Sequence, residues 1–363
     1  MSRDGKYFAG LLVLVMLLGG GSAFAEPYLA VRYGLKCETC HVNPTGGGLR
    51  SDFGDVFSQT QLPAHPIRGD WGLWTGAVTK WLRVGGDLRY DANFTQTPHA
   101  TTTHRDAVQQ GRMYAEAEVI PNRLIFYADA QVTPFPATDH EAYAIFWSAD
   151  HDWYIKGGKM YLPFGFRFED QTAFVYDTSS ITMYSPDHGL EFGWMRGHWD
   201  TQLTVSEGNA AGGLPSRPGK EYGLQASYVE SGWRLGIAAN DDDNPFARRR
   251  ILGLFGGVRT GPVEWLGEVD TVEFKSEPAV TQSAALLEAD WLIAAGNNLK
   301  VTFEPLDPDR DMHGNGQSRW SLVYELTPVQ FLQIRAGVRD YNGPRGIDAE
   351  NQTLMFVQLH VFF

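Results

Sequence analysis

Two thiols and an imidazole stand close together near the N-terminal end of the chain. The segment reads Cys37-Glu38-Thr39-Cys40-His41, and it holds the only two cysteines of the 363 residues. This spacing places two thiols against the two vinyl groups of a haem while the adjacent imidazole reaches the iron. We therefore predict one covalently bound haem c, with thioether bonds at Cys37 and Cys40 and with His41 as the proximal axial ligand of the iron.

Other chemistries fit the same residues less well. Two cysteines at this spacing can form a redox-active dithiol or a disulfide, and a short motif can also arise by chance. Neither a dithiol nor a disulfide makes use of the histidine that follows Cys40. A tetrahedral zinc site would need two more ligands in a compact group. The histidine and the export signal described next favour haem.

The N-terminal end has the features of a secretory signal peptide. Residues 1–25 combine a basic start, a short apolar run and small residues at Ala23 and Ala25. The run from Leu11 to Leu18 is too short for a helix that stays in the membrane, which needs roughly 20 apolar residues. We expect cleavage before Glu26 and export of the mature chain.

The segment that carries the two cysteines, residues 26–72, is too short to bury a core of its own. We expect the haem to supply much of that core. Residues 43–48 are expected to form a tight loop over the macrocycle, and residues 51–57 a short helical turn. The apolar residues available to wrap the haem are Tyr28, Leu29, Val31, Tyr33, Leu35, Val42, Phe53, Val56 and Phe57.

Most of the remaining chain, residues 73–363, alternates between apolar and polar side chains. Leu82, Val84 and Leu88, for example, interleave with Arg83 and Asp87. Charges would be costly on the buried face of a soluble sandwich, but they are expected on the face that lines a watery lumen. The pattern predicts an all-β fold, a transmembrane antiparallel β-barrel of about sixteen strands preceded by a small haem-binding plug. The expected strands are 82–95, 111–121, 122–134, 141–150, 152–163, 188–197, 199–208, 220–231, 232–243, 248–260, 262–275, 281–295, 298–306, 317–327, 331–341 and 351–363.

The expected connections alternate between short turns and long polar loops. Outer-membrane barrels have short periplasmic turns and long extracellular loops. An even number of strands then places both chain ends in the periplasm, so the haem segment would enter the barrel from that side. The terminal Phe363, preceded by alternating apolar residues, resembles the assembly signal of bacterial outer-membrane proteins. We expect the chain to lie in the bacterial outer membrane, in contact with its lipids.

The second axial position of the haem iron has three candidate solutions. No methionine lies between His41 and the first expected strand. His65 is the nearest candidate ligand, although it can equally be a solvated histidine in the linker between Pro63 and Pro66. His360, in the last strand, is a second candidate if the haem segment sits inside the barrel. The third solution is an open sixth position.

The formal charge of -13 argues against a nucleic-acid partner, because a phosphate backbone demands a basic face. The charge is compatible with cationic ligands, and an acidic lumen mouth would concentrate a divalent cation. For each acidic cluster, ordinary solvated loop charge is the stronger interpretation. The clusters are Asp241, Asp242 and Asp243, then Asp307, Asp309 and Asp311, and then Glu169, Asp170 and Asp177.

The order of a signal peptide, one Cys37-x-x-Cys40-His41 motif and a porin-like barrel ending in Phe363 resembles the fused monohaem cytochrome-porins of the outer membrane. Studied members of that family include iron oxidases. The resemblance implies electron transfer between an extracellular donor, Fe(II) first among the candidates, and a periplasmic cytochrome or other electron carrier. It implies a possible Fe(II) oxidase activity, but neither the direction of flow nor the donor.

Physical dimensions limit how such a protein can work. The apolar band of an outer-membrane barrel is roughly 25 Å tall, so a haem at its periplasmic edge could not exchange electrons quickly with the outside. The haem segment is therefore expected to plug the lumen. Two alternatives stay open: a diffusion porin whose haem segment is a gate or structural plug, and a conduit that works outward to extracellular acceptors.

Overall fold

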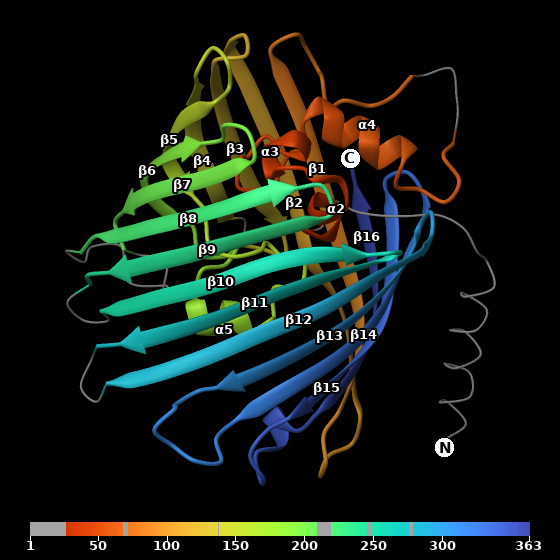
Figure 1. Ribbon diagram of the computed structural model, residues 1–363. Helices are drawn as coiled ribbons and strands as arrows, with labels where there is room; N and C mark the ends of the chain where they lie inside the picture. Colours follow the sequence, from red (N-terminus) through yellow and green to blue (C-terminus); the bar gives the residue numbers. More distant parts are fainter. Residues whose placement is uncertain (1–26, 68–71, 137, 209–218, 245–247, 276–278) are drawn as a thin grey trace.

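The computed structural model describes residues 27–67, 72–136, 138–208, 219–244, 248–275 and 279–363 (Figure 1). In this part of the chain, sixteen strands close into one antiparallel barrel, in which the first strand also pairs with the last. The predicted all-β barrel is thus confirmed. The expected signal peptide, residues 1–25, lies outside the described residues. None of the described helices is long and apolar enough to cross a membrane.

The observed strands follow the expected alternation closely, with one clear exception. The second strand begins at Thr103 instead of residue 111. Residues 103–106 are exposed and polar, so they pair with the first strand without showing the alternation that a buried face imposes. The strands are β1 (Leu82–Gln96), β2 (Thr103–Ile120), β3 (Leu124–Thr133), β4 (Thr138–Trp147), β5 (Trp153–Met160), β6 (Asp187–Trp194), β7 (Trp199–Ser206), β8 (Glu221–Glu230), β9 (Trp233–Asp242), β10 (Arg249–Thr260), β11 (Val263–Phe274), β12 (Val280–Ala294), β13 (Asn297–Asp307), β14 (Gln317–Val329), β15 (Leu332–Asn342) and β16 (Thr353–Phe362).

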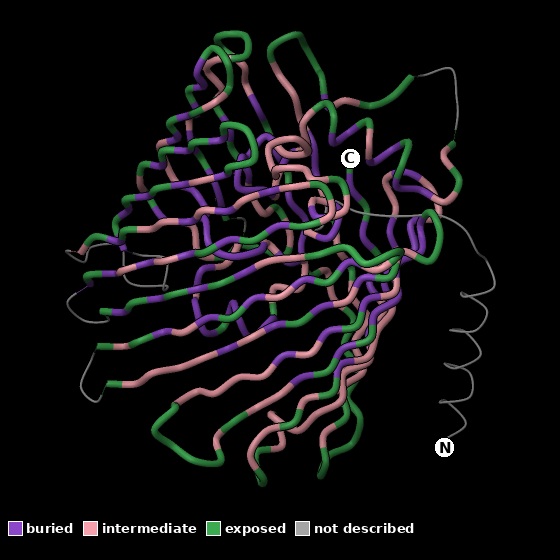
Figure 2. The backbone as a smooth tube through the Cα atoms, in the orientation of Figure 1, coloured by how far each residue is buried: buried purple, intermediate pink, exposed green. Residues whose placement is uncertain are grey.

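Buried and exposed residues alternate along the strands, as Figure 2 shows, and the two faces of a strand differ in polarity. In β9, Arg234 and Asn240 are buried toward the lumen, whereas Leu235 and Ile237 are exposed on the outside. Charged side chains therefore face inward and apolar side chains face outward. This is the polarity of a membrane barrel, the reverse of a soluble one.

The connections are short at one end of the barrel and long at the other. At the short end, which we call the tight-turn end, Gly232, Gly261 and Gly296 adopt positive φ angles that suit two-residue hairpins. β1 starts and β16 ends at this same end, as their pairing with the end of β2 and the start of β15 requires. The 3₁₀ helix η1 (Asp348–Glu350) lies in a long connection at the opposite end.

Tryptophans gather on the outer face near the tight-turn end. They lie at or close to strand ends, and all of them are exposed. Tryptophan is enriched where a membrane meets water, because its ring is amphipathic. The ring of tryptophans therefore fits one membrane interface. Its members are Trp81, Trp153, Trp194, Trp199, Trp233, Trp265 and Trp291.

Residues 27–67 form a plug inside the tight-turn end of the barrel (Figure 1). The plug contains the short helices α2 (Pro27–Tyr33), α3 (Cys37–Cys40) and α4 (Asp52–Thr60). Helix α2 contacts β9, β10 and β11, and its Arg32 pairs with Glu264 of the wall at 3.2 Å. The expected helical turn over residues 51–57 is confirmed as α4, whose N-cap Ser51 accepts a hydrogen bond from Gly54 N–H.

The connection between β5 and β6, residues 161–186, folds back into the lumen, and we call it the inner loop. It carries α5 (Phe174–Ser179), which contacts β11, β12 and β13. Apolar side chains of the plug, the inner loop and the wall form one buried cluster, which includes Tyr28, Phe166 and Phe255. Part of the lumen is therefore packed like a protein core.

Candidate functional site

A cavity lies inside the lumen between the plug, the inner loop and the wall. About 850 Å³ of space in it is free of protein atoms, part of it open to solvent. Cys37, Cys40 and His41 all line this space, which we call the thiol cavity. The structure thus brings the three predicted haem residues to one cavity.

A single helical turn positions the three side chains. In α3, Cys37 and Cys40 are three residues apart and so lie on the same side of the turn. The amide of His41 donates to the carbonyl of Cys37 at 3.0 Å. Ser51 ties the start of α4 to this turn, because its amide donates to Cys40 O at 3.0 Å and its hydroxyl donates to Thr39 O at 2.6 Å.

The loop that follows His41 turns tightly, as predicted for residues 43–48. Asn43 Oδ1 accepts hydrogen bonds from the amide and hydroxyl of Thr45, which forms an Asx turn. Gly46, Gly47 and Gly48 have φ angles of 91°, 77° and 68°, respectively. A Cβ at Gly48 would also lie 2.3 Å from the hydroxyl of Tyr127, so glycine is required there on two grounds.

Burial sets the protonation of the three side chains. It raises the pKa of the Cys37 thiol, which the Arg234 guanidinium only partly offsets, and it raises the pKa of Cys40 to about 12. Burial also lowers the pKa of His41 to about 3. At neutral pH the imidazole is therefore neutral, which is the form that binds a metal. A redox-active dithiol needs a lowered thiol pKa, so the raised values disfavour that alternative.

The lining of the thiol cavity fits a haem in its chemistry. Leu29, Phe57, Leu62 and Phe166 supply apolar surface for a flat ring, and three arginines supply positive charge for two carboxylates. Two thiols and a neutral imidazole complete the donor set that covalent haem attachment needs. The arginines are Arg50, Arg167 and Arg234.

The structure separates the two histidines that were considered as second axial ligands. The side chain of His65 is exposed, and its amide donates to Pro328 O at 3.0 Å, at the turn between β14 and β15. His65 does not line the thiol cavity. His360 is buried and lines a second cavity, which His41 also borders. Among the described residues that line the thiol cavity, His41 is the only histidine and there is no methionine.

The second cavity is more polar and includes a residue that the sequence analysis missed. Its free space is about 760 Å³. Met183 of the inner loop lines it, and its sulfur lies 3.4 Å from where a Cβ of Gly47 would stand. Only the inward fold of the loop brings Met183 near His41, so no local pattern could have indicated it. The arginine and carboxylate side chains that line this second cavity are Arg50, Asp87, Arg89, Arg112, Arg167 and Glu169.

The acidic clusters that were considered for a cation-binding mouth largely have local partners. Asp241, Asp242 and Asp243 face Arg250, Arg249 and Arg248 at 3.8, 3.8 and 3.4 Å across the β9–β10 hairpin. Asp170 pairs with Arg319 at 2.8 Å and with Arg339 at 2.9 Å. Asp307 and Asp309 each accept an amide hydrogen bond within their own loop.

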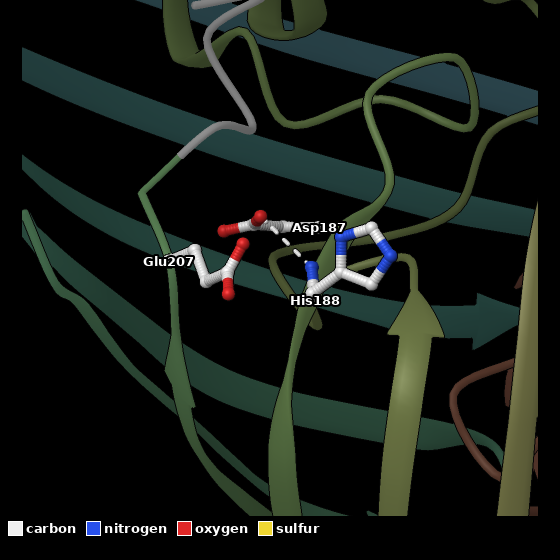
Figure 3. Close-up of side chains that lie close together, drawn as sticks. All are labelled: Asp187, His188 and Glu207. Atoms are coloured by element: carbon white, nitrogen blue, oxygen red, sulfur yellow. Dashed lines mark hydrogen bonds between the residues drawn. The ribbon is translucent and has the colours of Figure 1, made fainter. Parts of the chain in front are cut away.

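Among the described residues, one group of side chains of the types that can bind a metal lies elsewhere, at the long-loop end of β6 and β7 (Figure 3). One ligand atom from each of Asp187, His188 and Glu207 lies within 4.8 Å of the others. The carboxylate of Asp187 accepts hydrogen bonds from the amides of His188 and Gly208, each at 2.8 Å. His188 and Glu207 are exposed, and none of the three residues lines the thiol cavity.

Comparison with known proteins places the fold. No protein-family model matches the chain, and no curated protein matches it by sequence. A loop-deletion mutant of Vibrio cholerae OmpT is similar in structure, with a TM-score of 0.62, 10% identity, and coverage of 78% of this chain and 99% of OmpT. An anion-selective porin from Comamonas acidovorans has a TM-score of 0.60, 10% identity and coverage of 78% and 99%. Pseudomonas putida OprB has a TM-score of 0.58, 9% identity and coverage of 78% and 94%. The chain therefore has the fold of outer-membrane β-barrel porins.

Proposed function

We propose that this chain is an outer-membrane electron-transfer protein that carries one haem c inside a porin-like barrel. Thioether bonds at Cys37 and Cys40 would hold the haem, and His41 would be an axial ligand of its iron. When bound, the haem supplies one-electron redox chemistry. The observation that carries this proposal is that these three side chains converge on one cavity within the lumen of a barrel.

The chain's own residues hold the plug firmly against the wall and cover one side of this site with apolar surface. Asn43 Nδ2 donates to Glu141 of the wall at 3.2 Å, and Lys156 donates to Asn43 Oδ1 at 3.3 Å. Leu62 and Phe166, both nearly inaccessible to solvent, cover the apolar side of the thiol cavity. A rigid surrounding lowers the reorganisation that accompanies a change of charge. These contacts therefore suit electron transfer.

The arrangement of the barrel supports an orientation in the outer membrane. Outer-membrane barrels have short turns in the periplasm. With that orientation, both chain ends and the plug lie on the periplasmic side, where a periplasmic cytochrome or other carrier could reach the plug. The ring of tryptophans near the tight-turn end then meets the inner edge of the lipid layer.

Fe(II) is the first candidate for the extracellular donor. The chain resembles the fused cytochrome-porins, some of which are iron oxidases, and its formal charge of -13 favours cations. Electron flow in the opposite direction, toward extracellular acceptors, would use the same haem site. Small soluble iron would approach through the lumen from the long-loop end.

A diffusion porin with a structural haem plug is the second candidate function, because the fold is that of porins. The lumen of a diffusion porin is polar and filled with water. Here the plug, the inner loop and the wall share a buried apolar cluster, which includes Val31, Phe174 and Ile251. This packing favours a conduit for electrons over a channel for solutes.

Reconstituted vesicles would separate the two functions. The mature protein, made in a host that attaches haem c, is inserted into vesicles that hold a reducible dye, and Fe(II) is added outside. We expect the dye to be reduced while an uncharged sugar of similar size to the dye is retained. The matched control is the Cys37→Ser, Cys40→Ser variant, which should leave the dye oxidised. Sugar leakage without haem-dependent dye reduction would support the porin and contradict the conduit.

A further inference from the structure

Two guanidinium groups at the thiol cavity have no carboxylate partner among the residues that the structure describes. Arg50, in the plug, lies with its guanidinium carbon 4.4 Å from the centre of the Phe362 ring. Its Nε is buried and makes no hydrogen bond to a described residue. Asp55 acts on this charge electrostatically, but its carboxylate pairs with Arg83 at 3.3 Å, and no ion pair joins Arg50 to a described carboxylate. The positive charge of Arg50 is therefore not neutralised by an ion pair.

Arg167, in the inner loop, is held only by neutral oxygens. Its Nε donates to Thr45 O at 2.8 Å, and its Nη2 donates to Thr45 Oγ1 at 3.0 Å. The guanidinium carbon lies 5.4 Å from the centre of the Tyr161 ring. These contacts fix the orientation of the side chain without a carboxylate, at least within the described ranges.

Most other arginines of the lumen pair with a carboxylate; Arg112, which borders the second cavity but not the thiol cavity, instead donates to Tyr161 and Met183. Arg234 lines the same cavity, but its Nη2 donates to Asp200 at 2.9 Å. Arg319 and Arg335 pair with Glu304 and Glu325 at 2.5 and 3.1 Å. Arg50 and Arg167 are half-buried and have no carboxylate in direct contact, so each can bind negative charge that is placed in the cavity.

The number and type of these groups match the haem that the thiols would attach. Haem carries two propionate carboxylates, and the planar guanidinium of arginine binds a carboxylate through paired hydrogen bonds. Both arginines also border the second, more polar cavity. They therefore stand where the carboxylate edge of an apolar ring would meet polar surroundings.

We propose that Arg50 and Arg167 bind the two propionate carboxylates of the haem attached at Cys37 and Cys40. This assignment rests on the proposed function, because it requires the haem. It makes the two arginines positioning residues that also set the reduction potential. Each neutralises a negative charge near the iron, which makes the reduced state easier to reach.

The test compares three single charge removals in the full-length mature protein. Arg50→Gln and Arg167→Gln would each leave one propionate without its counter-ion. Arg32→Gln is the matched control, because Arg32 lies in the plug and already pairs with Glu264. In this variant Glu264 keeps a second partner, Arg259, at 3.5 Å. Arg50→Lys and Arg167→Lys keep the charge. The readouts are haem content by intact mass, the midpoint potential, and the propionate bands in the resonance Raman spectrum.

We expect all five variants to keep the haem, since the thioether bonds are covalent. The two Gln variants at the cavity should shift the reduction equilibrium toward the oxidised form by about tenfold, which is about 59 mV for one electron. Their propionate bands should shift as well, whereas Arg32→Gln should match the wild type and the Lys variants should recover most of the potential. Haem-loaded Gln variants with unchanged potential and bands would overturn this assignment alone. A wild-type chain without haem mass would overturn the proposed function and this assignment together.

Discussion

The barrel wall and the plug are built in opposite ways. Each strand of the wall pairs with its neighbours in sequence, and β1 closes the barrel against β16. The plug instead makes its contacts far along the chain. Asn43 binds Glu141, 98 residues away, and Arg32 binds Glu264, 232 residues away. The wall is thus encoded by local alternation, whereas the plug depends on a finished barrel and, in our account, on the haem.

Removal of both thiols should have the largest effect and should separate the two regions. The Cys37→Ser, Cys40→Ser variant is expected to lose covalent haem completely, because no other cysteine exists in the chain. The wall should still close, since its strands do not need the plug in order to pair. Intact mass measures the first outcome, and heat-dependent migration on a gel measures the second. A variant that failed to form a closed barrel would show that the wall depends on the haem.

Two glycine substitutions, one in the plug and one in the wall, compare how tightly the two regions are packed. A Cβ at Gly54 of α4 would lie 2.1 Å from the carbonyl oxygen of Cys40, so Gly54→Ala must push α4 away from α3. We expect a cost of about 3 kcal/mol in plug docking, seen as faster proteolysis of the plug and a lower haem yield. Gly267→Ala in the wall is the control, because its nearest neighbour would be 3.8 Å away. Equal effects of the two substitutions would contradict the difference between plug and wall.

Two asparagine substitutions, one in the plug and one in the wall, should also differ in their cost to stability, by a smaller amount. Asn43→Ala removes the Asx turn with Thr45 and the contacts to Glu141 and Lys156. Because these partners are buried, the expected cost to plug docking is about 2 kcal/mol. Asn342→Ala, an exposed position that bonds Asp340, should change stability by less than about 0.5 kcal/mol. Denaturant titration followed by protease sensitivity of the plug measures both variants.

A change of pH should have the smallest effect on stability, and it should act on the docking of the plug. Burial raises the pKa of Asp55 in α4 from 3.8 to about 6, although Arg50 and Arg83 oppose this rise. The docked plug therefore binds this proton more tightly than an undocked plug does. The stability that the proton contributes is present below about pH 4 and is lost as the pH rises through about 6. Protease sensitivity of the plug should increase over this interval, and the increase should disappear in Asp55→Asn. A wild-type profile that stayed flat would refute the effect.

The parts of the molecule that the sequence predicted well are those with a local pattern. Alternation predicted β9 at residues 232–243, and the strand runs from Trp233 to Asp242. The tight loop at residues 43–48 was predicted from its asparagine, proline and glycines, and the helical turn predicted for residues 51–57 corresponds to α4. The start of β2 was missed because exposed hairpin residues need no alternation.

The parts that the sequence could not predict depend on distant contacts. Met183 reaches the second cavity only because the inner loop folds inward, and Arg167 reaches Thr45 for the same reason. The aspartates at residues 241–243 were interpreted as solvated loop charge, yet the hairpin register pairs them with the arginines at residues 248–250. That pairing could have been inferred from the short connection between the two strands. His65 had the right residue type, but the linker carries it to the turn at Pro328.

The mass and visible spectrum of the mature protein, purified from outer membranes of a host that attaches haem c, test covalent haem attachment at Cys37 and Cys40 most directly. We predict a mass that exceeds the polypeptide by one haem, together with Soret absorption. Both should be lost in the Cys37→Ser, Cys40→Ser variant. A wild-type mass equal to that of the polypeptide, with no Soret absorption, would contradict the account.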